Sequence, residues 1–515
     1  MRPSYSRFSL LRALKKSSFK IFALLSKKEI VIFYVASILF VCLELLFIFL
    51  NINFIAAIIP LLALIVYWSL FSLDKLILFV VLCTPLSIKY HIPGLELGQI
   101  SVGMALPTEP LMFGIMLIFF LNIAYSGYDK KIIRHPVSIL ILISLAWMFI
   151  TCLTSTKYVV SFKFLIERIW DVVTFYFLGI LLFKKSKNIS TFNWLYIISF
   201  TGVIIYTFIR HYPSHFSEKG AHTAVTPFYN DHTAYGALLA MFLPVLGGFS
   251  LLKKTKPSAR IAAFVLFLVF LLALAFSYSR AAWLSTAGVL AVLILMLLRV
   301  QLKWILSGCV LGICLFFAYQ TSIIMKLQRN NTDVSQDLGK EIQSISNISS
   351  DASNRERLNR WSCAYRMWLD KPVFGFGPGT YSFKYAPYQL SYMRTIISTN
   401  QGNAGNAHNE YLGPLAEQGL LGMLAMLGIA TSVFFLAFRL FYNLKDPDMR
   451  ILTISIFLGL VSYFIHGMMN NFLDTDKASV PFWGFIGMLV AIDLTTKAEA
   501  EKPQTSTPVV ADGKE

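Results

Sequence analysis

The sequence has few charged residues for its length. They make up 14% of the 515 residues, whereas soluble domains average about 25%. Hydrophobic residues make up 56%, the mean hydropathy is +0.65, and apolar runs of about 20 residues recur along the chain. These features exclude an ordinary soluble protein. They predict an all-α polytopic membrane protein, because backbone groups in lipid must form their hydrogen bonds within their own segment.

The six cysteines indicate neither a disulfide framework nor a zinc site. No CxxC pair occurs, and Cys363 alone lies in a long polar segment, where it has no neighbouring thiol. The others fall in apolar runs, as small apolar residues of helices do: Cys42, Cys83, Cys152, Cys309 and Cys314.

Acidic residues are also scarce, 27 against 45 basic ones, and the net charge is +18. The basic excess lies in short loops and at the termini, where it favours contact with anionic membrane lipids rather than with nucleic acid. Residues 1–28 are basic and contain no A-x-A-like cleavage site. We therefore expect residues 1–29 to form an uncleaved cytoplasmic N-terminus.

The apolar runs predict about 12–14 transmembrane helices, about eleven of them within 30–320 and three within 416–495. The candidate spans are 30–50, 52–72, 74–90, 108–126, 137–154, 164–183, 192–210, 233–252, 260–278, 281–298, 303–320, 416–440, 451–470 and 478–495. The positive-inside rule places five basic loops and both termini in the cytoplasm: 129–135, 184–188, 253–260, 299–303 and 439–450. We expect 496–515 to be a disordered cytoplasmic tail.

Two of the remaining, outward-facing loops are long enough to be functional. The first, 211–232, contains four histidines whose spacing matches no compact zinc pattern, so we expect a solvated loop: His211, His215, His222 and His232. The second, 321–415, is expected to be a large periplasmic loop. Ser353 and Glu356 form a capping box in it, and apolar residues recur at helical spacing up to Pro372, which predicts a helix.

Four charged residues in the sixth span are unusual, because charge at membrane depth is costly: Lys163, Glu167, Arg168 and Asp171. Their spacing allows pairing within the helix, and lining of a polar cavity is an equally open alternative. The glycine-rich stretch 375–379 is similar to a phosphate-binding loop. It follows a helix rather than a strand, however, so the sequence favours a simple turn.

Two residues could carry chemistry. Arg280 lies in a very short outward connection, and its planar, permanently charged fork suits phosphate. By itself it is more typical of an interfacial arginine that reaches lipid headgroups. His408 lies in "GNAHNEYLGPLAEQGLLG" (405–422), where a nearby helix start would keep its imidazole neutral and able to accept a proton. By itself, a capping or hydrogen-bonded loop histidine is the more ordinary interpretation.

An ordered set of motifs resembles the O-antigen ligase and O-antigen polymerase superfamily. "NAHNEYLGPLAEQGLLG" (406–422) is similar to the family's His-Asn-x-Tyr-Leu…Glu-x-Gly-x-x-Gly signature. Three earlier segments resemble further family elements in the right order: "YNDHTAYGALLAMFLP" (229–244), "YSRAAWLS" (278–285) and "RWSCAYRMWLDKPVFGFGPGTY" (360–381). The resemblance covers about 230–425, and the N-terminal third is related by topology alone.

The resemblance implies an inner-membrane glycosyltransferase of the GT-C type that acts on the periplasmic face without metal or cofactor. Its donor would be a glycan on undecaprenyl diphosphate. A ligase would transfer this glycan to lipid A–core, and a polymerase would transfer it to another lipid-linked repeat unit. The resemblance places the catalytic base on His408.

The resemblance assigns diphosphate binding to Arg280 and to Arg360 or Arg357. Four further residues are expected to support the base or to face the acceptor: Asn409, Glu410, Tyr411 and Asn230.

Alternatives remain open at this point. The shared motifs describe the donor side, so they do not separate a ligase from a repeat-unit polymerase or a protein O-oligosaccharyltransferase. A secondary transporter would also suit many spans and intramembrane charges. Transporters usually show repeated halves, however, and this sequence has one dominant outer loop and no visible repeat. We favour the ligase.

Overall fold

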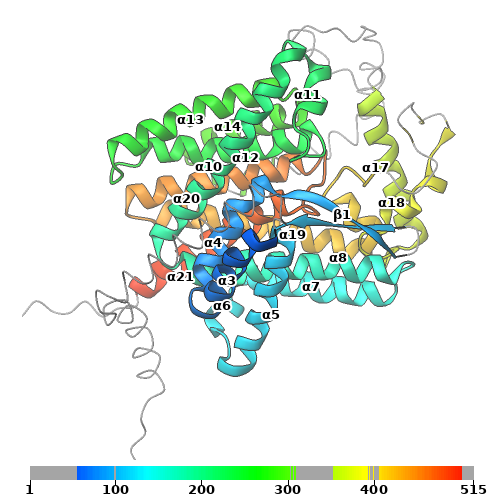
Figure 1. Ribbon diagram of the computed structural model, residues 1–515, viewed down its shortest axis with the longest axis horizontal. Coiled ribbons are helices and arrows are strands. Elements are labelled where there is room, and N and C mark those ends of the chain that lie inside the picture. Colours follow the sequence, from blue (N-terminus) through cyan, green and yellow to red (C-terminus); the bar gives the residue numbers. More distant parts are fainter. Residues whose placement is uncertain are drawn as a thin grey trace, which may run out of the picture. The chain divides into compact units, whose positions relative to one another are not determined.

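The computed structural model describes residues 55–97, 100–301, 303–304, 307–308, 352–391, 394, 398 and 405–500. The chain divides into two compact units, residues 1–76 and 77–515. The first unit contains α3 (Ile55–Phe71) and the start of α4 (Leu73–Cys83), and every later element belongs to the second unit (Figure 1). The expected N-terminus 1–29, the span 30–50, most of the span 303–320 and the tail from 501 onward lie outside the described residues.

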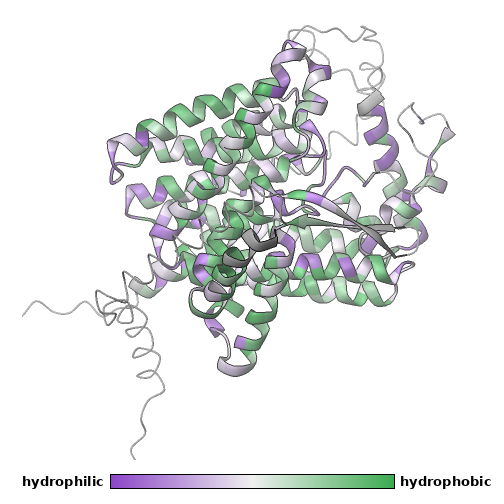
Figure 2. Ribbon diagram, in the orientation of Figure 1, coloured by the Kyte–Doolittle hydropathy of each residue, from purple (hydrophilic) through white to green (hydrophobic). Residues whose placement is uncertain are grey.

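Nine helices in the described ranges are long and apolar enough to cross a membrane. They are α5 (Thr108–Ser126), α7 (Pro136–Leu153), α10 (Ser186–His211), α12 (His232–Leu251), α13 (Pro257–Phe276), α14 (Arg280–Leu297), α19 (Leu412–Asn443), α20 (Pro447–His466) and α21 (Asp476–Ala500). Figure 2 shows hydrophobic residues along most of their length. The prediction of an all-α polytopic membrane protein is confirmed.

The sixth expected span forms a further helix with an interruption. α8 (Tyr158–Asp171) continues through a π-helical turn (Val172–Phe177) into α9 (Leu178–Phe183). It begins six residues earlier than the apolar run predicts, because its first turns are amphipathic rather than apolar. All residues of the π-helical turn are buried, and such turns are frequent at functional sites. α8 packs beside α7 (Figure 1) and carries all four charged residues noted in this span.

The core of the second unit is formed by α12, α20 and α21. In α21, 89% of the apolar window is buried, compared with 22% in α13. α20 packs against α12, α14 and α21. A Cβ at Gly459 of α20 would lie 2.7 Å from the carbonyl oxygen of Met241 on α12. Glycine at this position therefore allows the backbones of the two helices to approach closely. The outer helices expose leucine, isoleucine and phenylalanine, as surfaces that face lipid do.

A β-hairpin departs from the all-helical prediction. β1 (Ile88–Leu97) pairs antiparallel with β2 (Ile100–Leu106), and Lys89 lies opposite Ala105. The expected span 74–90 is therefore wrong beyond Cys83. Pro85 ends the helix in a 3-10 turn, η1 (Thr84–Leu86), because proline cannot donate the next helical hydrogen bond.

The segment expected to be a large loop is partly helical. The predicted helix is α17 (Ala352–Asp370), and Figure 2 shows it to be mainly hydrophilic. α18 (Tyr381–Lys384) and a 3-10 turn, η4 (Ala386–Tyr388), follow it. Cys363, Ala364 and Met367 form a small core with neighbours that include Phe376 and Tyr381. α17 also packs on α19, so this segment is attached to the membrane helices.

The remaining short elements connect the spans. They are α6 (Lys130–Ile133), η3 (Tyr212–Ser214) and α11 (Glu218–Ala224).

Basic loops that the sequence places on one side of the membrane contact each other in pairs. Lys254 Nζ lies 2.7 Å from Asp446 Oδ2, and the backbone N–H groups of Lys253 and Lys254 donate to Asp448. Lys184 Nζ lies 3.0 Å from Asp129 Oδ2. We call these loops (129–135, 184–188, 253–260 and 439–450) the basic end of the helices and the opposite side the loop end.

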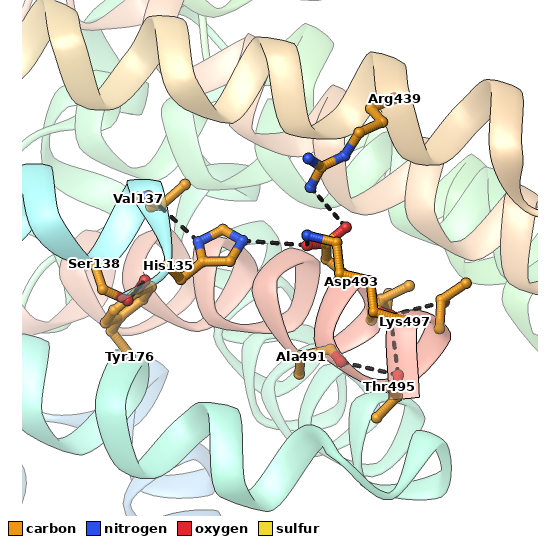
Figure 3. A network of polar contacts seen from close by, with 11 residues as sticks. His135, Val137, Ser138, Tyr176, Arg439, Ala491, Asp493, Thr495 and Lys497 are labelled. Atoms are coloured by element: carbon orange, nitrogen blue, oxygen red, sulfur yellow. Dashed lines mark hydrogen bonds and ion pairs between the residues drawn. The ribbon is translucent and has the colours of Figure 1, made fainter. Parts of the chain in front are cut away.

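A buried carboxylate joins three helices at the basic end (Figure 3). Asp493 of α21 lies 2.7 Å from Arg439 on α19, 2.9 Å from Lys497 and 3.4 Å from His135 Nε2, at the start of α7. His135 Nδ1 accepts the N–H of Val137, so Nε2 carries the proton that is donated to Asp493. The side chains of Asp493 and His135 are 4% and 3% exposed.

We expect Asp493→Asn to lower the free energy of unfolding by about 1–3 kcal/mol, because two cations and one N–H donor lose their shared acceptor charge. Thermal unfolding of the purified protein in detergent measures the change. Asp129→Asn is the matched control, since the exposed Lys184 pair contributes about 0–1 kcal/mol. Equal melting temperatures for the two variants would contradict this role of Asp493.

Candidate active site

His408 lies on the loop that leads into α19, in a backbone conformation that is rare for residues other than glycine. Its φ is +49°, and this left-handed region costs free energy that the surroundings must supply. Asn406 Oδ1 accepts the N–H of His408 at 3.2 Å, and Trp361 Nε1 donates to its carbonyl oxygen at 3.3 Å. The backbone of His408 is therefore held from both sides, and its side chain is half-buried.

The two flanking polar residues attach this loop to its surroundings. Asn409 Oδ1 accepts the N–H groups of Tyr411 and Leu412, both at 2.8 Å, and so caps the start of α19. Asn409 Nδ2 donates to the carbonyl oxygen of Met468, and Tyr411 Oη donates to that of Phe464. Both contacts tie the His408 loop to the end of α20 and the connection that follows it.

Glu410 makes the strongest of these attachments. Its Oε1 accepts hydrogen bonds from Tyr463 Oη at 2.6 Å and from the N–H groups of Phe472 and Leu473 at 2.8 and 3.0 Å. Burial raises the pKa of Glu410, although these donors favour its ionised form. Because one oxygen of this carboxylate already accepts three hydrogen bonds, Glu410 has a structural role: it holds the loop and does not take part in the reaction.

α17 brings two arginines to His408. The carbonyl oxygen of Asn406 accepts from Arg360, whose Nε lies 2.8 Å from Glu356 Oε1. Arg360 is 6% exposed, so its charge is buried and paired. Arg357 lies about one turn earlier on the same helix and acts electrostatically on His408.

Burial and these two charges together set the protonation state of His408. Burial, then Arg360 and Arg357, lower its pKa to about 4, and the carboxylates of Asp231 and Glu356 act in the opposite direction without reversing the shift. His408 is therefore a neutral imidazole at neutral pH. A neutral imidazole can accept a proton. Once protonated, His408 would carry a positive charge close to any anion that the two arginines bind.

The start of α12 supplies the acidic side of this region. Asp231 Oδ1 caps α12 by accepting the N–H groups of Thr233 and Ala234 at 2.7 and 2.8 Å. The next residue, His232, contacts the carbonyl oxygen of Ser277 through Nδ1 at 2.7 Å. Arg280 follows three residues after Ser277, as the first residue of α14.

His232, at the start of α12, is thus joined to the connection that leads into α14 and Arg280. α14 packs against both α12 and α20, and α20 ends at His466, on which Arg357 and Asp231 also act electrostatically. Asn230 lies at the surface of a nearby cavity. Of the residues expected at the site, Arg357 and Arg360 act electrostatically on His408, and Asn409, Glu410 and Tyr411 follow it on the same loop. Arg280 lies at the start of α14.

The glycine-rich stretch 375–379 is a turn, as the sequence favours. Gly375, Gly377 and Gly379 all have positive φ. The N–H groups of Gly379 and Tyr381 donate to the two carboxylate oxygens of Glu417, at 3.0 and 2.9 Å. Because an internal carboxylate takes the place a phosphate would need, this turn supports α19 instead of binding a ligand.

The expectation of a solvated histidine loop at 211–232 is only partly right. His215 and His222 are exposed, but His211 and His232 are buried. His211 Nε2 contacts the carbonyl oxygen of Ser217 at 2.7 Å, so it closes the turn before α11. The error arises because sequence spacing does not show that this loop folds back onto the helix ends.

Two adjoining cavities, of about 290 and 190 Å³, lie against the His408 loop. The larger is lined by Asn406, Ala407, Asn409 and Glu410 of that loop and by the charged face of α8. The two cavities share five lining residues: Lys89, Glu109, Asn406, Asn471 and Asp474. We call them together the inner chamber.

The structure shows one of the two expected pairs on α8, and three of the four charged residues line the larger cavity. Lys163 Nζ lies 3.4 Å from Glu167 Oε1, and Lys163, Glu167 and Arg168 line the larger cavity.

Residues 262–427 match the family model described as O-antigen ligase. The chain carries an O-antigen ligase domain over these residues, which supports membership of the O-antigen ligase and polymerase superfamily. No curated protein matches the chain significantly. The O-antigen ligase segment runs from α13 into the first half of α19, so it contains Arg280, Arg357, Arg360 and His408.

Sequence reasoning missed several residues around this O-antigen ligase site. Asp231 and His466 lie outside the matched segment. Folding brings them close enough to the site residues to interact with them electrostatically. Glu356 was noted as a helix-capping residue but pairs with Arg360. The i,i+4 spacing of these two residues on α17 is the signal that could have revealed the pair.

Proposed function

We propose that this chain is a glycosyltransferase that moves a glycan from undecaprenyl diphosphate to an acceptor hydroxyl, with lipid A–core as the acceptor. The observation that carries the proposal is a neutral His408 beside Arg357, within the segment that matches O-antigen ligase. A base next to fixed cations is what transfer from a diphosphate leaving group needs.

In this proposal His408 is the general base. It takes the proton of the acceptor hydroxyl as the oxygen forms a bond to the anomeric carbon. The bond from that carbon to the phosphate oxygen breaks, and undecaprenyl diphosphate leaves with the electron pair. Arg280 and Arg357 stabilise the negative charge that develops on the diphosphate, a role that guanidinium groups can fill without a metal ion.

The other site residues take positioning roles. Arg360 is occupied by Glu356 and by the carbonyl oxygen of Asn406, which suits a residue that shapes the His408 loop. Asn409, Glu410 and Tyr411 anchor the same loop through their contacts with α20 and the connection after it.

The basic end gives the proposed orientation. If the positive-inside rule holds, the basic end faces the cytoplasm and the loop end, with His408, faces the periplasm. Both termini are then cytoplasmic, and the protein lies in the inner membrane. A lipid-linked glycan could reach the site from the bilayer on that side.

A cellular experiment tests the reaction. Surface lipopolysaccharide and the lipid-linked glycan pool are compared in cells with and without this chain. A ligase predicts that loss of the chain leaves uncapped core while long glycan remains on the polyprenyl carrier. Core with a single repeat would instead show a polymerase, and unchanged pools would exclude both.

A further inference from the structure

The inner chamber carries more polar groups than base catalysis and diphosphate binding use. Three basic and five acidic side chains line its larger cavity: Lys89, Lys163, Arg168, Glu109, Glu167, Glu410, Glu417 and Asp474. The carboxylates of Glu410 and Glu417 are occupied by backbone N–H groups. Such a balance offers no net positive field to a diphosphate. The ligand that suits this chamber is therefore polar but uncharged.

Several buried polar atoms of the chamber wall have no hydrogen-bond partner within the described part of the chain. Arg168 NH1 and Trp483 Nε1 are donors, and Asn471 Oδ1 is an acceptor. Trp483 is 4% exposed. Native proteins rarely leave buried donors and acceptors unsatisfied, so these atoms indicate a ligand that both donates and accepts.

Aromatic rings frame these polar atoms. The guanidinium carbon of Arg168 lies 5.6 Å from the ring centre of Phe164 and 5.8 Å from that of Trp483. The rings hold the guanidinium in place and add apolar surface beside polar edges. A sugar ring has matching features, since its hydroxyls donate and accept while its C–H faces are apolar.

We propose that the inner chamber binds an uncharged sugar ring of a glycan substrate, with Arg168, Trp483 and Asn471 as specificity-determining contacts. This inference rests on the proposed function. Asn406 lines both cavities and also holds the N–H of His408, so a ring in the chamber lies against the loop that carries the base. A volume of about 290 Å³ is near the lower limit of small-molecule pockets, which suits one ring better than a long chain.

The test uses the full-length protein in lipid nanodiscs. The KM for the lipid-linked glycan donor and the KM for the acceptor are measured separately, together with the Kd for undecaprenyl diphosphate that carries no sugar. Trp483→Phe removes one donor and keeps an aromatic ring, and Arg168→Lys keeps the charge but loses the fork. Trp194→Phe is the matched control, because Trp194 packs on Phe249 outside the chamber wall.

We expect each chamber variant to raise one KM about tenfold and to leave the Kd for undecaprenyl diphosphate within about twofold of wild type. A rise confined to the donor KM assigns the ring to the donor glycan, and a rise confined to the acceptor KM assigns it to the acceptor.

Unchanged KM values in folded variants would overturn the inference while the proposed function stands. Loss of undecaprenyl diphosphate binding along with the KM change would also overturn it, because the effect would then be structural. If the wild-type protein does not bind undecaprenyl diphosphate, the proposed function fails and the inference fails with it.

Discussion

His408→Asn should lower glycan transfer by at least about 100-fold while the protein stays folded in the membrane. Asparagine tolerates the left-handed backbone that His408 adopts, with φ at +49°. It also keeps the backbone contacts with Asn406 and Trp361. The substitution therefore removes the base with little change in the loop. Transfer is measured on purified protein at matched amounts, from labelled donor to acceptor.

The pH dependence of transfer gives a second readout of the same residue. The base acts as the neutral imidazole, and the pKa of His408 is about 4. The wild-type rate should therefore stay level as the pH falls from about 7 to about 5 and should decline as it falls through about 4. A decline centred near pH 6.5 would indicate a solvated histidine. Full transfer by His408→Asn would remove His408 from the mechanism.

Hydrophobic runs predict most of the membrane helices. α13 and α14 follow their apolar runs within a few residues, because each is a continuous stretch of leucine, isoleucine, valine and phenylalanine. The helix over 352–370 also follows from its capping box and apolar period. Local composition decides these elements, so a single sequence is enough to place them.

Elements with mixed composition are harder to predict. β1 begins at Ile88, inside the expected span 74–90, and Pro85 and Pro93 are nearby residues that oppose a continuous helix there. The first six residues of α8 follow Lys157 and include Ser161 and Lys163, so an apolar window begins only after them. In both cases tertiary partners, rather than local hydrophobicity, determine the structure.

The candidate site is predicted only in part because its residues come from separated elements. His408 and Arg280 are visible as unusual residues near helix ends. Nothing local shows that Asp231 acts electrostatically on His408, or that Glu410 accepts a hydrogen bond from Tyr463. The hydrogen bonds of Glu410 join residues that are 53 or more positions apart in the sequence. Hydrophobic periodicity carries no information on such long-range contacts.

Arg357→Gln should lower transfer by about 100- to 1,000-fold, because a fixed positive charge is lost where the leaving diphosphate gains charge. It should also move the acidic limb of the pH profile to higher pH. Arg357 disfavours the protonated form of His408, so its removal raises the pKa of that imidazole toward the ordinary value. A merely structural arginine would change the rate without this shift.

Two variants on α17 make the Arg357 result specific. Arg355→Gln changes the same charge at an exposed position and should leave both the rate and the pH profile close to wild type. Arg360→Gln leaves the buried Glu356 without its ion-pair partner, so it should lower the melting temperature more than Arg357→Gln does. If Arg357→Gln kept its rate and Arg360→Gln lost it with an unchanged melting temperature, the diphosphate role would belong to Arg360. A loss of rate in all three variants would instead show a general need for positive charge on α17, since the exposed Arg355 is too well solvated to bind one leaving group selectively.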